Sequence, residues 1–501
     1  MFNRGIKSFY SPARDVIFVQ IITMNKRYFS FLAGVFLLMS AFGFSQGKQS
    51  EIIILHTNDM HSKIDNMAKL AYLADSLRKL HPYVFLVSAG DNFTGNPVVD
   101  MVPDKGYPMI DLMNHCGFEA SALGNHEFDM GQTLLKKRLL QAKFPFICCN
   151  MDGTDAVVGK LEPFTVLHAG SDITLALLGL IQLDDNGLPS AHPSNMKDVK
   201  FVNGLSKARD FTWLKKPYGI LIALSHLGVD DDIRLADSVP QFDVIIGGHS
   251  HTLLNPPRFE NGVMIVQTGA HMKYVGKMTL TVEDGKVVSK KDTVILFSSL
   301  KNEDHDVRTL IDLCNNNKEF NKIVGTAEKQ LEGEDELGSL MADAVTSQLK
   351  VDFAFQNRGG IRVSSLSQGD ISLKDVYKLD PFNNQVVIYS MKTDEIKSLI
   401  CYGYQHEKGI DLQVSGMTYQ VTDNGKGQCA KVEMYDMSGK PLDPAAEYSV
   451  AMNNYMAYTY KFDHTDPGTV STLTTAEALV RYLRMAGKIN YQGVKRATII
   501  Q

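Results

Sequence analysis

The stretch Gly124-Asn125-His126-Glu127-Phe128-Asp129 follows directly on a small apolar run, Ala120-Ser121-Ala122-Leu123. Such a run is typical of the end of a buried strand. An amide, an imidazole and a carboxylate placed together there would build a poor core. They can, however, present ligands to one point in space. A polar turn is the alternative interpretation, since Gly-Asn also favours turns.

Four further predicted strands end in the same kind of side chain. Their endings read Asn58-Asp59-Met60-His61, Gly90-Asp91-Asn92, Ser225-His226 and Gly247-Gly248-His249-Ser250-His251. A lone histidine at a strand end is usually structural, and His226 by itself would indicate nothing more. Random placement would not put five such endings at one edge of one sheet, so together they favour a functional site.

An α/β fold is indicated by the alternation of short β-branched runs with helical patterns between residues 51 and 282. The pattern predicts strands at 52–55, 84–88, 147–150, 173–180, 220–224, 244–246 and 263–267, and helices at 67–80 and 132–141. In such folds ligands gather beyond the carboxyl ends of the strands, where the five polar endings stand.

The length of 501 residues predicts two sizeable domains. We expect a catalytic domain at 46–299, a linker helix at 300–321 and a second α/β domain at 322–501. For the second domain the pattern predicts helices at 337–349, 393–405 and 475–486, the last closing the chain, and a strand at 353–356. The net charge of −5 gives no reason to expect nucleic-acid binding.

The first 45 residues are predicted to be a signal peptide. The basic Asn25-Lys26-Arg27 precedes an apolar run at 29–44, and cleavage is expected before Gln46. Translation is expected to start at Met24. The run is too short for a membrane span, and no later stretch is long enough for one. We therefore expect an exported protein, periplasmic or extracellular. Export would permit disulfides, but the spacing of the six cysteines specifies none.

The ligand types fit two metal ions. Hard divalent cations need oxygen and imidazole ligands from several loops, with one carboxylate shared between them. Two such ions about 3.5–4 Å apart can hold a hydroxide for in-line attack on a phosphate ester.

The five endings, in this order, resemble the calcineurin-like dinuclear metallophosphoesterases. More narrowly, the chain resembles the bacterial exported 5′-nucleotidases, a branch that includes UDP-sugar hydrolases and cyclic-nucleotide phosphodiesterases. The resemblance implies a four-layer αββα sandwich followed by a substrate-binding domain. It implies one metal held by Asp59, His61, Asp91 and His251, and a second held by Asp91, Asn125, His226 and His249. Zinc, manganese, iron and cobalt remain open as the two divalent ions.

The resemblance further implies that His126, paired with Asp129, faces the phosphoryl group without binding metal. A histidine held by a carboxylate can stabilise the charge that develops there.

In the second domain, Asn357-Arg358-Gly359-Gly360-Ile361-Arg362 is similar to the family's phosphate-binding segment. Guanidinium groups suit phosphate oxygens, although a surface turn with exposed arginines is the alternative. By the same resemblance Phe382, Asn384 and Tyr455 belong to the substrate pocket, with Phe382 and Tyr455 on the two faces of the base. The family's Gly-Gly-Asp-Gly is absent, and the chain reads Thr459-Tyr460-Lys461-Phe462 instead.

The resemblance therefore implies an enzyme that hydrolyses nucleoside 5′-monophosphates by attack of a metal-bridging hydroxide. Lys461 keeps open a UDP-sugar or a 2′,3′-cyclic nucleotide as the substrate. A nucleotide-binding protein without catalysis is a third hypothesis, which the complete set of ligand positions disfavours. We expect a monomer whose partner is the small nucleotide.

Overall fold

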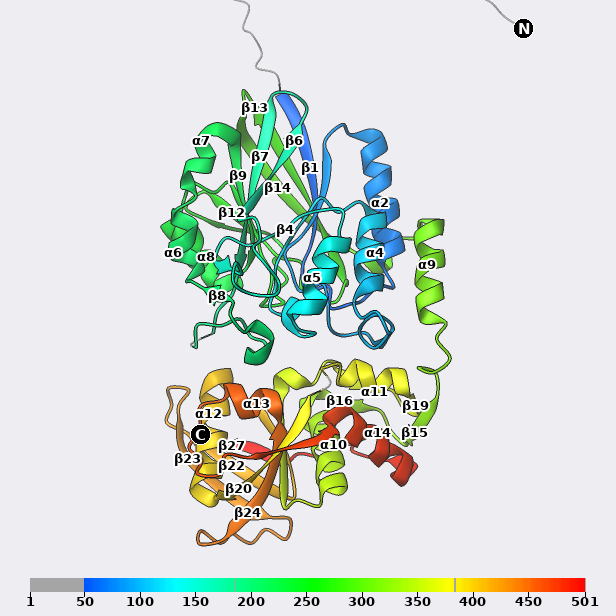
Figure 1. Cartoon of the computed structure of the whole chain (residues 1–501), viewed down its shortest axis with the longest axis vertical. Helices are drawn as coiled ribbons and strands as arrows, with labels where there is room; N and C mark the ends of the chain where they lie inside the picture. Colours follow the sequence, from blue (N-terminus) through cyan, green and yellow to red (C-terminus); the bar gives the residue numbers. More distant parts are fainter. Residues whose placement is uncertain (1–48, 185, 383, 501) are drawn as a thin grey trace, which may run out of the picture. The chain divides into compact units, whose positions relative to one another are not determined.

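The computed structural model describes residues 49–184, 186–382 and 384–500 (Figure 1). The predicted signal peptide at 1–45 and the expected start at Met24 lie outside the described residues. From Ser50 onward the chain forms a single compact unit, so the domain limits near 299 and 322 stay predictions. No helix in the described ranges is both long and apolar enough to cross a bilayer.

Two six-stranded sheets form the centre of the first half of the chain. The first has the strand order β14 (Lys286–Leu296), β13 (Tyr274–Glu283), β1 (Gln49–Thr57), β2 (Val84–Ser88), β3 (Ala120–Ala122), β4 (Phe146–Ile147). The second has the order β11 (Arg258–Glu260), β12 (Val263–Val266), β10 (Val244–Ile246), β9 (Gly219–His226), β7 (Ile173–Ile181), β6 (Phe164–Ala169). Strands β1 to β4 run parallel, as do β7, β9, β10 and β12, so their carboxyl ends lie at a shared edge in each sheet.

Strand β1 shows why the sheets stack. Ile52 and Ile54 belong to a core that also contains Leu175 and Ile222 of the second sheet. The alternate residues of β1 face instead the core beneath the helices. Both faces of the strand are buried from Ile52 onward, which explains its apolar run Ile52-Ile53-Ile54-Leu55.

Helices cover the outer faces of the two sheets (Figure 1). On the first sheet lie α2 (Met67–Leu80), α4 (Tyr107–Cys116) and α5 (Gln132–Gln141), and on the second lie α6 (Gly204–Arg209) and α8 (Val229–Ser238). This is the four-layer αββα sandwich, and the predicted fold is confirmed. The helices predicted at 67–80 and 132–141 match α2 and α5 at both ends.

The predicted strand 147–150 is wrong beyond Ile147. The N–H of Cys148 donates to the carbonyl of Glu162, and that of Cys149 donates to the carbonyl of Gly179. The backbone thus leaves the first sheet and bonds toward β7, which an apolar pattern alone cannot show.

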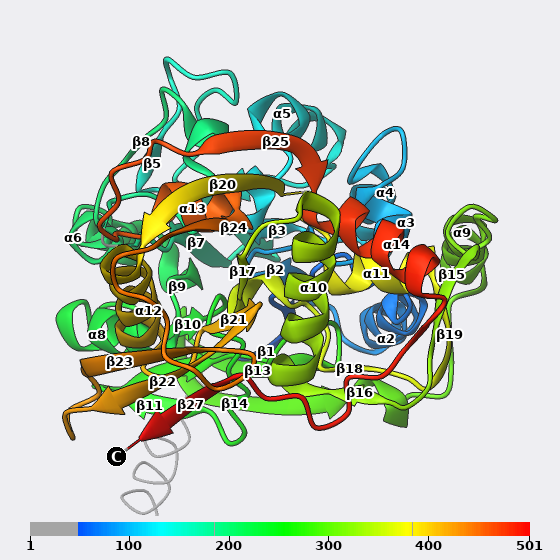
Figure 2. The same ribbon diagram turned by 90° about the horizontal axis from the view of Figure 1, so that it is seen from below.

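Helix α9 (His305–Asn315) follows the sandwich and packs against α2 and α4. The second domain is built on a five-stranded sheet in the order β21 (Leu412–Ser415), β17 (Phe353–Asn357), β24 (Glu447–Asn453), β20 (Gln385–Lys392), β25 (Thr469–Thr474). Its main helices are α10 (Gly333–Leu349), α11 (Leu373–Leu379), α12 (Thr393–Glu407), α13 (Asn454–Thr459) and α14 (Thr475–Ala486), of which α10 and α14 pack side by side (Figure 2).

Helix α14 does not close the chain as predicted. Strands β26 (Lys488–Ile489) and β27 (Ala497–Ile500) follow it. Strand β27 pairs in parallel with β22 (Met417–Asp423), about eighty residues earlier in the chain. A strand this short forms because of its distant partner, and local sequence does not predict it. A disulfide joins Cys401 of α12 to Cys429 of β23 (Cys429–Asp436), a pairing that the cysteine spacing did not specify.

A buried hydrogen bond anchors the strand that leads to the first ligand loop. The Nε2 atom of His56, in β1, lies 3.0 Å from Oδ1 of Asp292 in β14, and both side chains are essentially inaccessible. Gly276 of β13 leaves room for this ring, because a Cβ atom built there would overlap with it.

We predict that Gly276→Ala lowers the free energy of unfolding by about 1–3 kcal/mol, because overpacking forces the buried ring or the strand to shift. Urea unfolding measures the change. Gly409→Ala is the control, since a methyl group at Gly409 would meet open space. Equal stability of the two variants would contradict the packing argument.

Candidate active site

The residues that follow β1, β2, β3, β9 and β10 converge at the carboxyl edge of the sandwich. Asp91 lies at the centre of this convergence, only 1% exposed, with its Oδ2 atom 3.1 Å from Nε2 of His226. The Oδ1 atom of Asn125 lies 3.2 Å from the same Nε2 and 3.1 Å from Nδ1 of His249. These four side chains thus enclose one small space.

Three more predicted ligands gather on the other side of Asp91. The Nε2 atoms of His61 and His251 are 3.0 Å apart, and Nε2 of His251 lies 3.4 Å from Oδ1 of Asp59. Nε2 of His61 lies 3.9 Å from Oδ2 of Asp91. Asp91 therefore stands between the two groups of predicted ligand atoms.

Five of these residues have left-handed backbone conformations that non-glycine residues rarely adopt. The φ angles are 48° at Asp59, 46° at His61, 53° at Asp91, 72° at His249 and 53° at His251. Each costs on the order of 1–2 kcal/mol relative to ordinary backbone. Such strain clusters at functional sites, where the surrounding structure holds it in place.

Backbone carbonyls orient two of the imidazoles. Nδ1 of His61 lies 3.1 Å from the carbonyl of Thr94, and Nδ1 of His226 lies 2.7 Å from that of Ala89. A ring that donates from Nδ1 presents an unprotonated Nε2 to the centre, which is the form that binds metal.

The charges of the centre agree with this arrangement. Burial by itself would raise the pKa of Asp91, but His226 and His126 hold that pKa well below its usual range. Burial, followed by the positive charge of His226, lowers the pKa of His249 to about 4. The centre thus offers an ionised Asp91 carboxylate and a neutral His249 imidazole, and ligand atoms from Asp91, His226 and His249 lie within 4.8 Å of one another. The donor set fits divalent cations.

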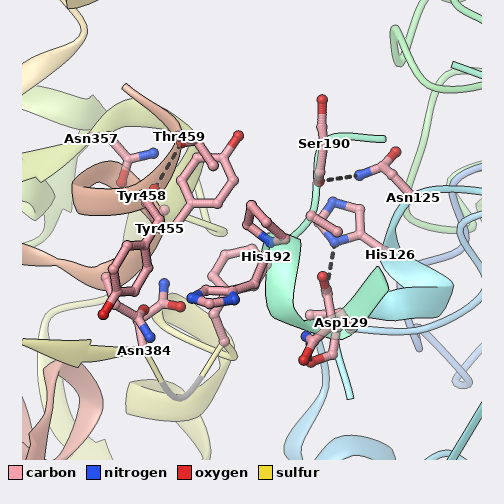
Figure 3. A pocket seen from close by; sticks show the side chains of 18 of the residues that line it. Asn125, His126, Asp129, Ser190, His192, Asn357, Asn384, Tyr455, Tyr458 and Thr459 are labelled. Atoms are coloured by element: carbon pink, nitrogen blue, oxygen red, sulfur yellow. Dashed lines mark hydrogen bonds and ion pairs between the residues drawn. The ribbon is translucent and has the colours of Figure 1, made fainter. Parts of the chain in front are cut away.

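His126 and Asp129 form a pair beside this centre. Nδ1 of His126 lies 2.6 Å from Oδ2 of Asp129, and Nε2 of His126 lies 3.9 Å from Oδ2 of Asp91 (Figure 3). Burial disfavours the imidazolium, yet the charges of Asp129 and Asp91 outweigh it and raise the pKa of His126.

A cavity of about 1290 Å³ extends from this centre and is lined by both halves of the chain. Arg362 reaches the metal-type ligands, with its Nη2 atom 3.1 Å from Nε2 of His61. Phe382 lies against His126, with ring centroids 5.7 Å apart, and beneath the Arg362 guanidinium. Asn384 and Tyr455 line the cavity across from His126 (Figure 3).

Arg358 is the predicted substrate-binding residue that does not line the cavity. Its side chain is half exposed, and Nε donates to Oε1 of Glu334 at 2.7 Å. Lys461 and Tyr460, in the segment that replaces the glycine-rich motif, do line the cavity.

Comparison with known proteins agrees with this architecture. The calcineurin-like phosphoesterase family matches residues 52–253, and the 5′-nucleotidase C-terminal domain family matches residues 317–461. Protein UshA of Escherichia coli (strain K12) is 27% identical over 530 residues, which cover 90% of this chain and 94% of UshA. The chain belongs to the 5′-nucleotidase family. It is therefore a metal-dependent phosphoesterase, and its calcineurin-like domain implies a dinuclear metal site.

Two further relatives place limits on the comparison. Endonuclease YhcR of Bacillus subtilis (strain 168) is 26% identical over 463 residues, which are 81% of this chain but 37% of YhcR. A 5′-nucleotidase precursor from Thermus thermophilus has a crystal structure similar to this fold, with a TM-score of 0.80 at 24% identity over 90% of this chain and 99% of that chain. At such identity the structural likeness shows the fold alone.

Glu127 holds the centre of this family site together, although the sequence pattern assigned it no role. Its carboxylate accepts the N–H groups of Asp91 at 3.1 Å, Asn92 at 2.7 Å and Gly124 at 2.7 Å. Burial and the nearby charge of Asp91 raise the pKa of Glu127 to about 7. The signal in the sequence that could have indicated this role is an acidic residue between a histidine and an apolar residue, His126-Glu127-Phe128, at the end of a buried strand.

The carboxylate of Asp100 likewise accepts backbone N–H groups, in the neighbouring loop that contains Thr94 and Gly95. It accepts the N–H groups of Gly95 at 2.7 Å and Asn96 at 2.6 Å and the hydroxyl of Ser62 at 2.7 Å. This fixes the loop whose Thr94 carbonyl orients His61.

We predict that Glu127→Gln weakens metal retention by at least about tenfold, because the new amide group would face backbone N–H donors and displace the Asp91 loop. Elemental analysis after dialysis against graded chelator measures retention. Glu119→Gln is the matched control, since that carboxylate also accepts a strand N–H, from Leu86, but lies outside the ligand set. Equal metal content in the two variants would contradict the role of Glu127.

Proposed function

We propose that this chain is an exported two-metal phosphoesterase that hydrolyses nucleoside 5′-monophosphates to nucleoside and phosphate. The observation that carries the proposal is the single cavity that contains Asp91 and His126 together with the aromatic rings of Phe382 and Tyr455. Small-molecule sites span roughly 300–1,000 Å³. This cavity is somewhat larger, at about 1290 Å³, so it has room for a nucleotide.

The proposed metal ligands divide into two sets that share Asp91. One set is Asp59, His61, Asp91 and His251, and the other is Asp91, Asn125, His226 and His249. Zinc, manganese, iron and cobalt all accept such mixed oxygen and imidazole ligands. Two bound cations would polarise the phosphoryl oxygens and generate a nucleophile from water at neutral pH.

His126 is proposed to stabilise the reacting phosphoryl group. Asp129 orients the ring through Nδ1 and favours the cationic form, so that Nε2 carries a proton toward the substrate. Arg362 is half-buried beside His61 and supplies a second positive group for the phosphate oxygens. Both groups act on charge that develops in the transition state.

The base is proposed to stack between Phe382 and Tyr455, which is worth about 1–3 kcal/mol by analogy with bases bound on aromatic rings. In this structure Phe382 lies against His126 instead, with ring centroids 5.7 Å apart. Substrate would therefore have to displace the ring from His126.

A UDP-sugar or a 2′,3′-cyclic nucleotide is the second candidate substrate. It is favoured by Lys461 and Tyr460, which line the cavity in the segment that replaces the family's glycine-rich motif, and by His406 of α12, which lines the same cavity. A cationic side chain and further rings would suit a second phosphate or a larger leaving group.

Export is supported by the disulfide between Cys401 and Cys429, since such bonds persist in oxidising compartments. The mature protein is proposed to act in the periplasm or outside the cell as a monomer.

We predict that the purified protein releases phosphate fastest from nucleoside 5′-monophosphates in a panel that also holds UDP-glucose and 2′,3′-cyclic AMP. Chelator should abolish hydrolysis, because the proposed nucleophile needs both ions, and added manganese, cobalt or zinc should restore it. Preference for the sugar nucleotide or the cyclic ester would replace the proposed substrate. Nucleotide binding without turnover in metal-loaded protein would indicate a non-catalytic binder.

We predict that Asp129→Asn lowers kcat by about 10²-fold or more and moves the alkaline limb of the kcat profile to lower pH. Asp129 raises the pKa of His126, so the active imidazolium persists to higher pH in the wild type and is lost earlier without that charge. Steady-state kinetics across pH measures both effects. Asp155→Asn, which removes an exposed carboxylate paired with Lys200, is the control. An unmoved alkaline limb would contradict the role of the cationic ring.

A further inference from the structure

The turn that follows β12 carries a histidine outside all five ligand motifs. His271 and Met272 both have left-handed backbone conformations, with φ angles of 60° and 53°. Two consecutive non-glycine residues in this region are costly, so the surrounding structure has to hold the turn in place.

Hydrogen bonds to the first ligand loop provide that hold. The N–H of His271 donates to the carbonyl of Asp59 at 2.7 Å. The side chain of Asn58 donates to the carbonyl of Gly269 at 2.5 Å and accepts the N–H of Thr268 at 2.8 Å. The turn is thus fastened to the loop that presents Asp59 and His61, and the position of the His271 ring is set relative to these ligands.

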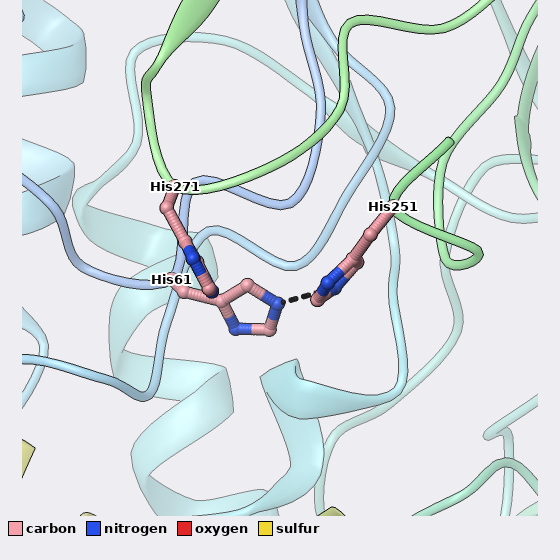
Figure 4. A group of neighbouring side chains, drawn as sticks. All are labelled: His61, His251 and His271. Atoms are coloured by element: carbon pink, nitrogen blue, oxygen red, sulfur yellow. Dashed lines mark hydrogen bonds between the residues drawn. The ribbon is translucent and has the colours of Figure 1, made fainter. Parts of the chain in front are cut away.

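The His271 ring points toward the His61 and His251 rings (Figure 4). Its centroid lies 5.2 Å from that of His61 and 5.5 Å from that of His251, compared with 5.0 Å between those two rings. Potential ligand nitrogens of all three lie within 4.8 Å of one another. Nitrogens bound to one ion at about 2.1 Å can be at most about 4.2 Å apart, so small ring movements would suffice for shared binding.

No other role for the ring is visible in the described part of the chain. There the ring makes no hydrogen bond or ion pair to another side chain, and its close ring neighbours are the two histidines. Both His251 and His271 reach the surface, so an incoming ion has access to them. The His271 imidazole is held by strained backbone beside two proposed metal ligands, and its position is that of a third ligand.

We propose that His271 is a further ligand of the metal ion held by Asp59, His61, Asp91 and His251. The inference rests on the metal assignment of the proposed function and adds a residue to it. The two ions then differ in kind: the first has three imidazoles, whereas the second has two imidazoles and an amide oxygen. Imidazole-rich sites favour zinc, cobalt or nickel over magnesium and calcium, so the first ion is expected to be the more selective.

Metal retention in full-length His271→Ala tests the proposal without an activity measurement. Wild-type protein is expected to keep two equivalents of zinc, and the variant to lose one equivalent at chelator concentrations at least about tenfold lower. Titration of the metal-free proteins with cobalt(II) should give different visible spectra, since band intensity follows coordination number. His115→Ala is the matched control, because His115 is an exposed histidine on α4 outside the site.

His271→Gln, which keeps much of the side-chain volume, guards against a folding defect, and the melting temperatures of the metal-free proteins are compared. Equal zinc retention and identical cobalt spectra in wild type and both variants would overturn the role of His271 while leaving the two-metal enzyme intact. Loss of both ions to the same degree would also overturn it. Wild-type protein that retains fewer than two equivalents would overturn the proposed metal assignment together with this inference.

Discussion

The buried charge of Asp91 is the constraint on which the rest of the site depends. An ionised carboxylate that is 1% exposed is stable only with compensating partners. The partners here are His226, His126 and the backbone N–H of His126, which donates to Oδ1 at 2.9 Å. His226 ends β9 of the second sheet, and His126 follows β3 of the first sheet. The need to surround this carboxylate therefore ties the two sheets together at their carboxyl edge.

Close packing around Asp91 limits which residues can stand nearby. A Cβ atom at Gly124 would overlap with the Asp91 carboxylate, and one at Gly90 would come within 2.9 Å of the His226 ring. Glu127 completes the enclosure by accepting three backbone N–H groups that would otherwise be buried without partners. Strained backbone on one side and a buried acceptor on the other together fix the positions of the side chains around Asp91.

The second domain contributes charge and rings to the same centre. Arg362 beside His61 and Phe382 against His126 bring a guanidinium and an aromatic face to a site whose proposed ligands all precede residue 290. In the proposed function Arg362 acts on the phosphate together with the sandwich residues, whereas Tyr455, Tyr460 and Lys461 line the cavity where the leaving group would lie. Substrate preference can then change without change in the ligands.

The sequence by itself determined the α/β class, the limits of α2, α5 and α14 and the strand ends whose polar side chains converge, because these follow from local periodicity and from side-chain chemistry. It could not determine where Arg358 points, which cysteines pair, that β27 joins β22, or that Glu127 accepts backbone groups from two loops. Nor could it bring His271, which stands in no motif, to the rings of His61 and His251. Each of these depends on partners far apart in the chain, and only the folded backbone, through packing and burial, brings them within contact distance.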